Sequence, residues 1–219
     1  MQSPMSSHKK FEQFRTEYRR GDLLEKDAPE SPLALFEIWF AEVSEVASPE
    51  PNAMILATAD KNGMPSQRAV LLKEVAGGQF IFYSNYESRK GMDLAANPAA
   101  ALLFYWPELH RQVRIEGMVS RVAGDISDRY FASRPRESQL GAWASQQSST
   151  IENRQTLEDT FREVAEKFEG RDVPRPPYWG GYQLRPVRME FWQGRPNRLH
   201  DRLLYCREAE SWLRSRLSP

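Results

Sequence analysis

The sequence contains a single cysteine, Cys206, and only three histidines, which lie far apart. One cysteine excludes a disulfide within the chain, and without a Cys/His cluster we expect no metal site. No apolar run approaches the roughly 18 residues that a membrane-spanning helix needs. The N-terminus also lacks the apolar core of a signal peptide. We therefore expect a soluble, cytoplasmic protein with no membrane partner.

The chain also lacks an excess of charge of either sign, since 30 basic side chains balance 30 acidic ones. This balance gives no indication of a nucleic-acid partner. The basic residues are unequal in kind, however, because 23 are arginine and only seven are lysine. The arginine fork suits phosphate and carboxylate groups, although drift in composition is an alternative explanation. No GxGxxG or GxxxxGK[ST] motif occurs, so neither a Rossmann fold nor a P-loop is supported.

The order of predicted elements favours a mainly β protein. We expect residues 1–10 to be disordered and residues 11–219 to form a single domain. Hydrophobic residues make up 40% of the whole chain, which is sufficient for a packed core. Helices are predicted over 11–20, from Ser31-Pro32, and over 87–96, 125–133, 137–145 and 151–168. Strands are predicted over 53–59, 66–75, 79–84, 99–106, 113–120, 182–192, 198–207 and 211–217. Successive strands with short turns predict an antiparallel barrel with peripheral helices.

A basic row occupies the stretch from Phe191 to Arg202. Arg198, His200 and Arg202 are two residues apart, so on an extended strand they share one face. Leu199 and Leu203 then point to the other side, towards a core. Such a row is suited to holding an anion, but a solvated edge strand that resists aggregation explains it equally well.

Two further groups of cations flank apolar strands. Arg68 and Lys73 stand at the two ends of one predicted strand, where their side chains can also simply reach solvent. Ser88-Arg89-Lys90 opens a predicted helix, and helix N-termini suit phosphate groups. Basic residues at that end run against the helix dipole, and local conflicts of this kind often mark sites.

A third group lies around the predicted junction of two helices. Tyr130 and Arg134 are four residues apart on one helix, and Ser138 starts the next. Their hydroxyl and guanidinium groups form a plausible phosphate clamp, while a plain helix corner with Ser138 as cap is the alternative. The polar segment 145–149 adds amide and hydroxyl donors or serves only as a linker.

These blocks, taken together and in order, resemble the pyridoxamine 5′-phosphate oxidase family. The similarity extends over almost the whole chain. It rests on Arg15-x-Glu17-Tyr18, Arg68-x-Val-Leu-Leu-Lys73, Phe82-Tyr83-Ser84-Asn85, Ser88-Arg89-Lys90, Arg111-Gln112-Val113, Tyr130-Phe131-x-Ser133-Arg134-Pro135-Arg136-x-Ser138-Gln139, Gln147-Ser148-Ser149, Trp179-Gly180-Gly181, Glu190-Phe191-Trp192-Gln193-Gly194, Arg198-Leu199-His200-Asp201-Arg202 and Arg216-Leu217-Ser218-Pro219.

The resemblance implies an antiparallel FMN-binding split β-barrel that forms a homodimer with two flavin sites across the subunit interface. The implied FMN contacts are Arg68, Ala69, Val70, Leu71, Leu72, Lys73, Tyr83, Ser84, Arg89, Lys90, Gln112, Gln147, Ser148, Trp192 and Arg202. The implied substrate contacts are Arg15, Tyr18, Lys73, Tyr130, Arg134, Ser138, Arg198, Leu199 and His200. Arg15 and Tyr18 match a segment that closes over the substrate in this family.

The implied reaction is the oxidation of pyridoxamine 5′-phosphate or pyridoxine 5′-phosphate to pyridoxal 5′-phosphate. A hydride equivalent passes from the substrate C4′ carbon to flavin N5, and O2 reoxidises the flavin to give H2O2. This is the salvage reaction and final step of pyridoxal phosphate synthesis. Arg198 and His200 are the expected catalytic residues: Arg198 covers the substrate, and His200 orients the C4′ substituent or takes its proton.

Two other classes of protein fit parts of this pattern. A flavin oxidase of secondary metabolism or a deazaflavin-dependent reductase on the same barrel is expected to lose part of the Tyr130, Arg134 and Ser138 clamp or the Arg198 and His200 pair. A haem- or flavin-binding storage protein is expected to lose the substrate clamp while keeping flavin contacts. This chain retains both groups.

Overall fold

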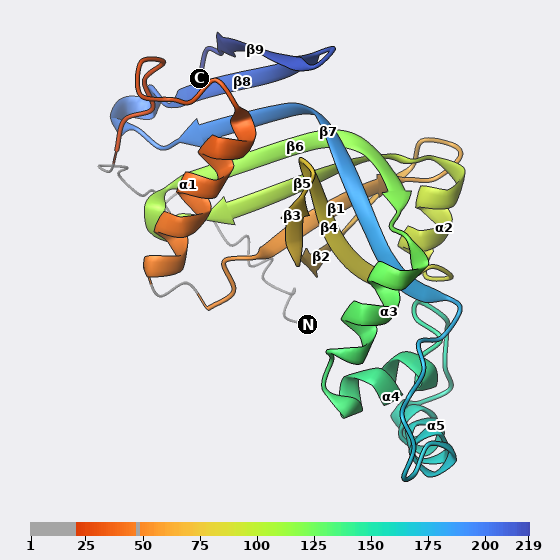
Figure 1. Ribbon diagram of the computed structural model, residues 1–219. Coiled ribbons are helices and arrows are strands. Elements are labelled where there is room, and N and C mark those ends of the chain that lie inside the picture. Colours follow the sequence, from red (N-terminus) through yellow and green to blue (C-terminus); the bar gives the residue numbers. More distant parts are fainter. Residues whose placement is uncertain (1–20, 47–48) are drawn as a thin grey trace, which may run out of the picture.

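The computed structural model describes residues 21–46 and 49–219 (Figure 1). Within them, nine strands form one sheet. The strands are β1 Ala53–Ala59, β2 Pro65–Leu71, β3 Glu74–Ala76, β4 Gln79–Asn85, β5 Ala99–Trp106, β6 Arg111–Arg121, β7 Trp179–Gln193, β8 Asp201–Glu208 and β9 Ser211–Arg216. The helices are α1 Pro32–Glu45, α2 Arg89–Ala96, α3 Gly124–Ala132, α4 Arg136–Ala144 and α5 Arg154–Lys167, with short 3-10 turns η1 Pro107–Leu109 and η2 Pro196–Arg198.

The strands follow the order β2-β1-β5-β6-β7-β4-β3, and β8 pairs with both β7 and β9. Every pair is antiparallel. The sheet curls on itself, and the helices lie around it (Figure 1). These findings confirm the prediction of a mainly β fold with an antiparallel sheet and peripheral helices.

The main core lies between α1 and the curled sheet. Proline at the first turn of α1 supplies a fixed φ where its missing N–H costs nothing, and Ser31 stands at the N-cap position. Aromatic side chains on the buried face of α1 pack edge-on against rings of three strands. The distance between ring centroids is 5.0 Å for Phe36 and Phe80, 5.1 Å for Phe36 and Phe104, and 5.3 Å for Trp39 and Phe191. Such edge-on ring pairs stabilise a core beyond what the burial of their apolar surface alone contributes.

A second, smaller cluster packs the helical end of the molecule against the start of β7. It contains the buried residues Phe131, Leu140, Phe168, Val173 and Trp179. Helices α3, α4 and α5 gather at this end, away from β8 and β9 (Figure 1). The helix expected over 151–168 begins later, at Arg154, because Asn153 caps it by accepting from the Thr156 N–H at 3.0 Å.

The strand expected over 66–75 is divided in two. β2 pairs with β1, whereas β3 pairs with β4, so the chain changes partners at Leu72 and Lys73. The Leu72 N–H still donates to Asn52 O on the β1 side, and the Lys73 N–H donates to Ile81 O on the β4 side. Alternating hydrophobicity could not reveal this corner, because the pattern continues across it.

The helix predicted over 11–20 lies outside the described residues. Within the described ranges, no helix is both long and apolar enough to cross a membrane.

Candidate active site

A cavity of about 790 Å³ opens between the sheet and the helical end of the chain. Its walls come from β2, β4, the start of α2, the α3–α4 corner and the segment after α4. The lining residues are Ser66, Arg68, Ala69, Val70, Leu71, Lys73, Tyr83, Ser84, Arg89, Lys90, Tyr130, Arg134, Pro135, Ser138, Gln147, Ser148 and Trp179. Five of these are Lys or Arg, and none of the lining residues described is Asp or Glu. The cavity is therefore suited to anions.

Lys90 is the most buried cation of the cavity, at 8% exposure. Its Nζ donates to Ser84 Oγ at 2.9 Å, to Ser88 Oγ at 3.0 Å and to Gln147 Oε1 at 2.6 Å. All three partners are neutral, so the charge is solvated but not neutralised. Burial, followed by repulsion from Arg68, lowers the pKa of Lys90 to about 8. The negative charge of a bound phosphate would offset the effects of burial and of Arg68 on this pKa.

The position of Lys90 depends on a close approach between α2 and the end of β4. A Cβ on Gly91 would lie 2.0 Å from Tyr86 O and 2.9 Å from Asn85 O, so only glycine fits there. Ser88 caps α2 through its side chain, which accepts from the Gly91 N–H at 3.4 Å. The helix therefore begins beside the strand, with Arg89 and Lys90 in its first turn.

Arg68 is held at the cavity wall by neutral groups. Its Nη1 donates to Thr58 Oγ1 at 2.8 Å and to Leu56 O at 3.2 Å, and its Nη2 donates to Ser66 Oγ at 2.9 Å. Asp93 lies 3.9 Å from Arg68 and accepts from the Thr58 hydroxyl at 2.7 Å. Burial lowers the pKa of Arg68, partly offset by Asp93. The guanidinium is thus fixed in orientation before any ligand arrives.

Arg134 contributes a buried donor that has no protein partner in the described chain. Its Nη1 is buried and makes no hydrogen bond, while its guanidinium lies over the Trp179 ring at 4.6 Å. Burial lowers its pKa. An unpaired buried guanidinium nitrogen is costly, so its presence in an anion-suited cavity makes Arg134 a candidate for a ligand contact.

Aromatic rings line the cavity beside Arg134. The rings of Tyr83 and Tyr130 stack with centroids 3.8 Å apart, and Tyr130 is parallel to Trp179 within 2° at 6.2 Å. The four-residue spacing predicted that Tyr130 and Arg134 lie on one helix. Helix α3 ends at Ala132, however, so Arg134 lies in the turn that follows it. Ser138 lies in the first turn of α4, and all three reach the same cavity.

A second set of predicted site residues lies elsewhere, around the connection from β7 to β8. Gln112, Trp192, Arg198, Leu199, His200 and Arg202 do not line the cavity, and neither does Leu72, which is buried in the core. Gln112 is opposite Trp192 in the β6–β7 pair, and the Trp192 ring lies 4.7 Å from the His200 ring. Figure 1 places β8 far from the α3–α4 corner.

The predicted strand face of Arg198, His200 and Arg202 is wrong. β8 begins only at Asp201, and Arg198 ends the turn η2 with a φ of 62°. Leu199 is 70% exposed and does not point into a core, although Leu203 does. Arg202 is held by Glu190, with Nε and Nη2 each 2.9 Å from Oε1. The pattern of alternating residues could not show that proline and two left-handed residues, Asn197 and Arg198, interrupt the strand.

Sequence reasoning missed several residues that shape the cavity. Ser66, Pro135 and Trp179 line it, and Thr58 and Asp93 orient Arg68. Trp179 stood in a recognised motif without a role assigned to it. Thr58 and Asp93 carried no signal, because their part depends on contacts between segments that are far apart in sequence.

Arg15 and Tyr18 lie outside the described residues. Within residues 21–46 and 49–219, no group of three or more His, Cys, Asp or Glu side chains could hold a metal ion.

Comparisons with known proteins agree with this architecture. Residues 40–168 match the family model described as pyridoxamine 5′-phosphate oxidase. Residues 179–219 match the model of the pyridoxine 5′-phosphate oxidase C-terminal dimerisation region. The pyridoxine/pyridoxamine 5′-phosphate oxidase of Rubrobacter xylanophilus is 54% identical over 216 residues, covering 99% of this chain and 100% of that protein. The protein of the same name from Burkholderia ambifaria is 57% identical over 209 residues, covering 94% and 97%.

Solved structures give the same picture. PhzG from Burkholderia lata, in complex with tetrahydrophenazine-1-carboxylic acid, superposes with a TM-score of 0.85 at 32% identity, covering 90% of this chain and 98% of that one. A pyridoxamine 5′-phosphate oxidase-related, FMN-binding protein from Nostoc punctiforme has a TM-score of 0.68 at 17% identity, covering 88% and 100%, which shows a shared fold alone. The expected split-barrel fold and the expected resemblance are both confirmed, and the chain belongs to the pyridoxamine 5′-phosphate oxidase family of enzymes.

Proposed function

We propose that this protein binds FMN and oxidises pyridoxamine 5′-phosphate and pyridoxine 5′-phosphate to pyridoxal 5′-phosphate. The observation that carries the proposal is the cavity with five cations and no lining carboxylate. Two separate cationic groups face it, which suits a phosphorylated cofactor and a phosphorylated substrate together. The names of the relatives that are 54% and 57% identical support the same reaction.

The first group would hold the FMN phosphate. Arg68, Arg89 and Lys90 supply positive charge on adjacent elements, and the lowered pKa of Lys90 indicates charge that is not yet compensated. Ser84 and Gln147, which already contact Lys90, add neutral polar groups beside it. Ala69, Val70, Leu71, Lys73, Tyr83 and Ser148 complete the proposed flavin contacts on the cavity wall.

The second group would hold the phosphate of the substrate. Lys73, Tyr130, Arg134 and Ser138 approach the cavity from the β2–β3 corner and the α3–α4 corner. The unpaired Nη1 of Arg134 is the donor that this phosphate would satisfy. Fixing the phosphate, which does not react, orients the reacting end of the substrate, so binding energy is used for alignment.

The second set of residues would come from a partner subunit. Gln112, Trp192, Arg198, Leu199, His200 and Arg202 lie apart from the cavity on one chain, so a homodimer in which each site spans both subunits would reunite the two sets. The match to a dimerisation region supports this arrangement. So does an exposed face on β5 and β6, where Tyr105 is 59% and Met118 49% exposed. We take residues 11–219 as one domain in this proposal.

When bound, FMN would supply the acceptor for a hydride equivalent from the substrate C4′ carbon, and O2 would restore it with release of H2O2. The alcohol substrate would give the aldehyde directly, whereas the amine substrate would give an imine that water hydrolyses to the aldehyde and ammonia. Arg198 would cover the substrate, and His200 would contact its C4′ end. Arg15 and Tyr18 are proposed as further substrate contacts. A cytoplasmic location is part of the proposal and agrees with the single cysteine.

The test is the absorbance spectrum of the FMN-reconstituted protein before and after anaerobic addition of pyridoxamine 5′-phosphate. We expect a flavin spectrum that bleaches on addition, recovers in air and leaves pyridoxal 5′-phosphate in solution. A bound flavin that stays oxidised with both phosphorylated vitamers would retain the cofactor but refute the substrates. Failure to bind FMN would refute the proposal as a whole.

A further inference from the structure

The turn that carries Arg198 and His200 has an unfavourable backbone. Asn197 and Arg198 have φ values of 56° and 62°, in the left-handed region that residues other than glycine rarely adopt. Neighbouring Pro196 accepts the Leu199 N–H at 3.1 Å, which closes only a single 3-10 turn. Such conformations persist where the surrounding structure fixes both ends of the segment. The contacts on either side of this turn therefore determine where His200 lies.

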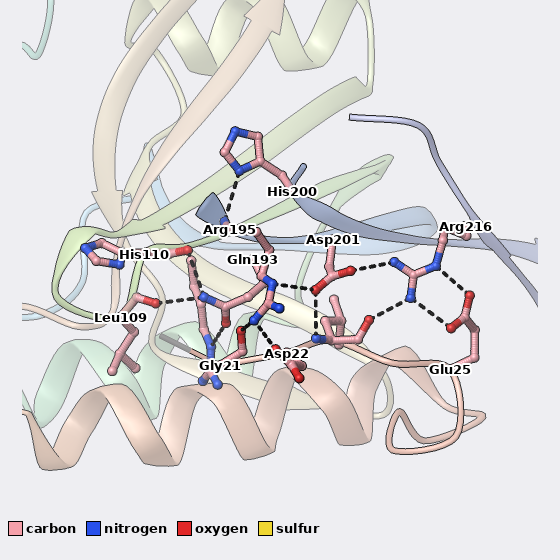
Figure 2. A network of polar contacts seen from close by, with 12 residues as sticks. Gly21, Asp22, Glu25, Leu109, His110, Gln193, Arg195, His200, Asp201 and Arg216 are labelled. Carbon is pink, nitrogen blue, oxygen red and sulfur yellow. Dashed lines mark hydrogen bonds and ion pairs between the residues drawn. The ribbon is translucent and has the colours of Figure 1, made fainter. Parts of the chain in front are cut away.

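Arg195 fixes the beginning of the turn. Its Nη1 donates to Gly21 O at 2.5 Å and also to the carboxylate of Asp22, while its Nε lies 3.6 Å from Asp201 Oδ2 (Figure 2). The Arg195 backbone N–H donates to His200 Nδ1 at 3.1 Å. One residue thus holds the N-terminal strap of residues 21–25 with its side chain and the imidazole with its main chain.

Asp201 fixes the end of the turn. Its carboxylate accepts from the Leu23 N–H at 3.2 Å and from Arg216 Nη1 at 2.7 Å. Arg216 also donates to Glu25 at 2.6 and 2.8 Å and to Leu23 O at 2.8 Å, which ties the strap to β9 (Figure 2). The hydrogen bond from Arg216 lowers the pKa of Glu25 to about 2, so this pairing persists at any working pH.

These contacts decide which nitrogen of His200 carries hydrogen. An imidazole nitrogen that accepts a hydrogen bond has no hydrogen of its own, so a neutral His200 is protonated at Nε2. Protonation at Nδ1 would set two N–H groups against each other. Burial, followed by the charge of Arg198, lowers the pKa of His200. The Asp201 carboxylate is directed to Leu23, Arg216 and the Arg195 side chain.

We propose that Arg195 is a positioning residue that holds His200 as the Nε2-protonated tautomer, so that His200 acts on the substrate as a hydrogen-bond donor and not as a proton acceptor. The identity of the substrate rests on the proposed function, whereas the tautomer is a property of this turn. The strap of residues 21–25 begins three positions after Tyr18, so the same residue also anchors the segment that follows a proposed substrate contact.

The test is the tautomeric state of His200 in FMN-loaded protein labelled with ¹⁵N-histidine, read from long-range ¹H–¹⁵N correlations near pH 7.5. The chain has only three histidines, and His200→Asn assigns the signal. We expect wild-type His200 in the single Nε2-protonated form and Arg195→Ala in a mixture of both tautomers. Arg195→Lys should retain most of the wild-type form, because it keeps a cation beside Asp22 and Asp201. Arg207→Ala, on β8 and paired with Glu210, is the matched control and should leave His200 unchanged.

Kinetics supply the second readout. Loss of one positioned hydrogen bond should raise the KM for pyridoxamine 5′-phosphate in Arg195→Ala by about fivefold, with FMN affinity unchanged. A wild-type His200 protonated at Nδ1, or an Arg195→Ala protein with an unaltered tautomer, would overturn the inference even if the enzyme turns over its substrate. A protein inactive on both vitamers but with His200 in the expected tautomer would instead refute the proposed function alone.

Discussion

The cations of the cavity and the arginines of β8 and β9 beside the β7–β8 connection differ in what they contact. In the cavity, Lys90 and Arg68 donate to hydroxyls, an amide and a backbone carbonyl, and Arg134 keeps one nitrogen unpaired. Around the connection, Arg202 donates to Glu190, and Arg216 donates to Glu25 and Asp201. The neutral partners orient Lys90 and Arg68 without cancelling their charge, although Asp93 lies 3.9 Å from Arg68. Around the connection, the arginines pair directly with carboxylates and hold chain segments together.

The pKa shifts follow the same division. The pKa of Lys90 is lowered to about 8 by burial and by Arg68, as expected for a cation that lacks a counter-ion. The pKa of Arg216 is raised, chiefly by its hydrogen bond with Glu25. Partner chemistry therefore separates the cavity cations, which keep an uncompensated charge, from Arg216, whose charge is paired with Glu25 and Asp201.

The largest expected effect is the recovery of activity when a variant of the cavity and a variant of the β7–β8 connection are mixed to form heterodimers. Arg134→Ala removes a charge-assisted contact and should raise the KM for substrate roughly 10- to 100-fold, and His200→Ala should also impair turnover. If each site takes its cavity from one subunit and its turn from the other, a heterodimer of these variants contains one intact site. Mixed at equal amounts after reversible dissociation, the two should regain about a quarter of wild-type activity, since half the dimers are then mixed.

The matched control mixes Arg134→Ala with Ser138→Ala. Both changes lie in the same cavity, yet a mixed dimer would then have one defect in every site, so no activity should return. Recovery confined to the first pair supports a shared site. No recovery in the first pair, with heterodimers demonstrated by a tag, would place each site within one chain and remove the reason for assigning His200 to the partner.

Much of the fold could be predicted because its elements are regular and locally encoded. The strands Ala53–Ala59 and Ala99–Trp106 were predicted with the bounds that the structure shows, since turn residues delimit their apolar runs. The corner at Leu72 and Lys73 could not be predicted, because it depends on which strand each half pairs with. Periodicity reports which face is buried but not the partner.

The same contrast applies to the site. Arg68 and Lys90 line the cavity and stand on regular elements within recognisable motifs, so the sequence was sufficient to select them as candidate site residues. The alternation of Arg198, His200 and Arg202 suggested one strand face, but the left-handed residues Asn197 and Arg198 fold that stretch into a turn. The strap that holds the turn leaves no local pattern, because Gly21 and Arg195 are 174 residues apart in sequence.

An intermediate effect is expected from Thr58→Val, which tests whether neutral partners orient Arg68. The change preserves shape but removes the hydroxyl that accepts from Arg68 at 2.8 Å and donates to Asp93 at 2.7 Å. We expect FMN affinity to fall about tenfold, as one oriented contact to the phosphate is loosened. Riboflavin, which has no phosphate, should bind the variant and the wild type equally in the same fluorescence titration.

Thr58→Ser is the control, because it keeps the hydroxyl and removes only a methyl group. It should bind FMN within about twofold of wild type, since no hydrogen bond is lost. Equal losses for FMN and riboflavin in Thr58→Val would mean that the pocket as a whole has relaxed, and that Thr58 has no particular role towards Arg68.

The smallest expected effect is the dependence of FMN affinity on pH, which sharpens the contrast between Lys90 and the arginines. Lys90 is charged below its ligand-free pKa of about 8 and loses its proton as pH rises through that value. A phosphate dianion favours the charged lysine, so binding above pH 8 must take up a proton, and affinity declines. Measured by fluorescence quenching, the dissociation constant should be level from pH 7 to 7.5 and rise by about fourfold near pH 8.5. Lys90→Arg keeps its charge throughout and should show no such rise, and a slope that survives this change would place the titrating group elsewhere in the cavity.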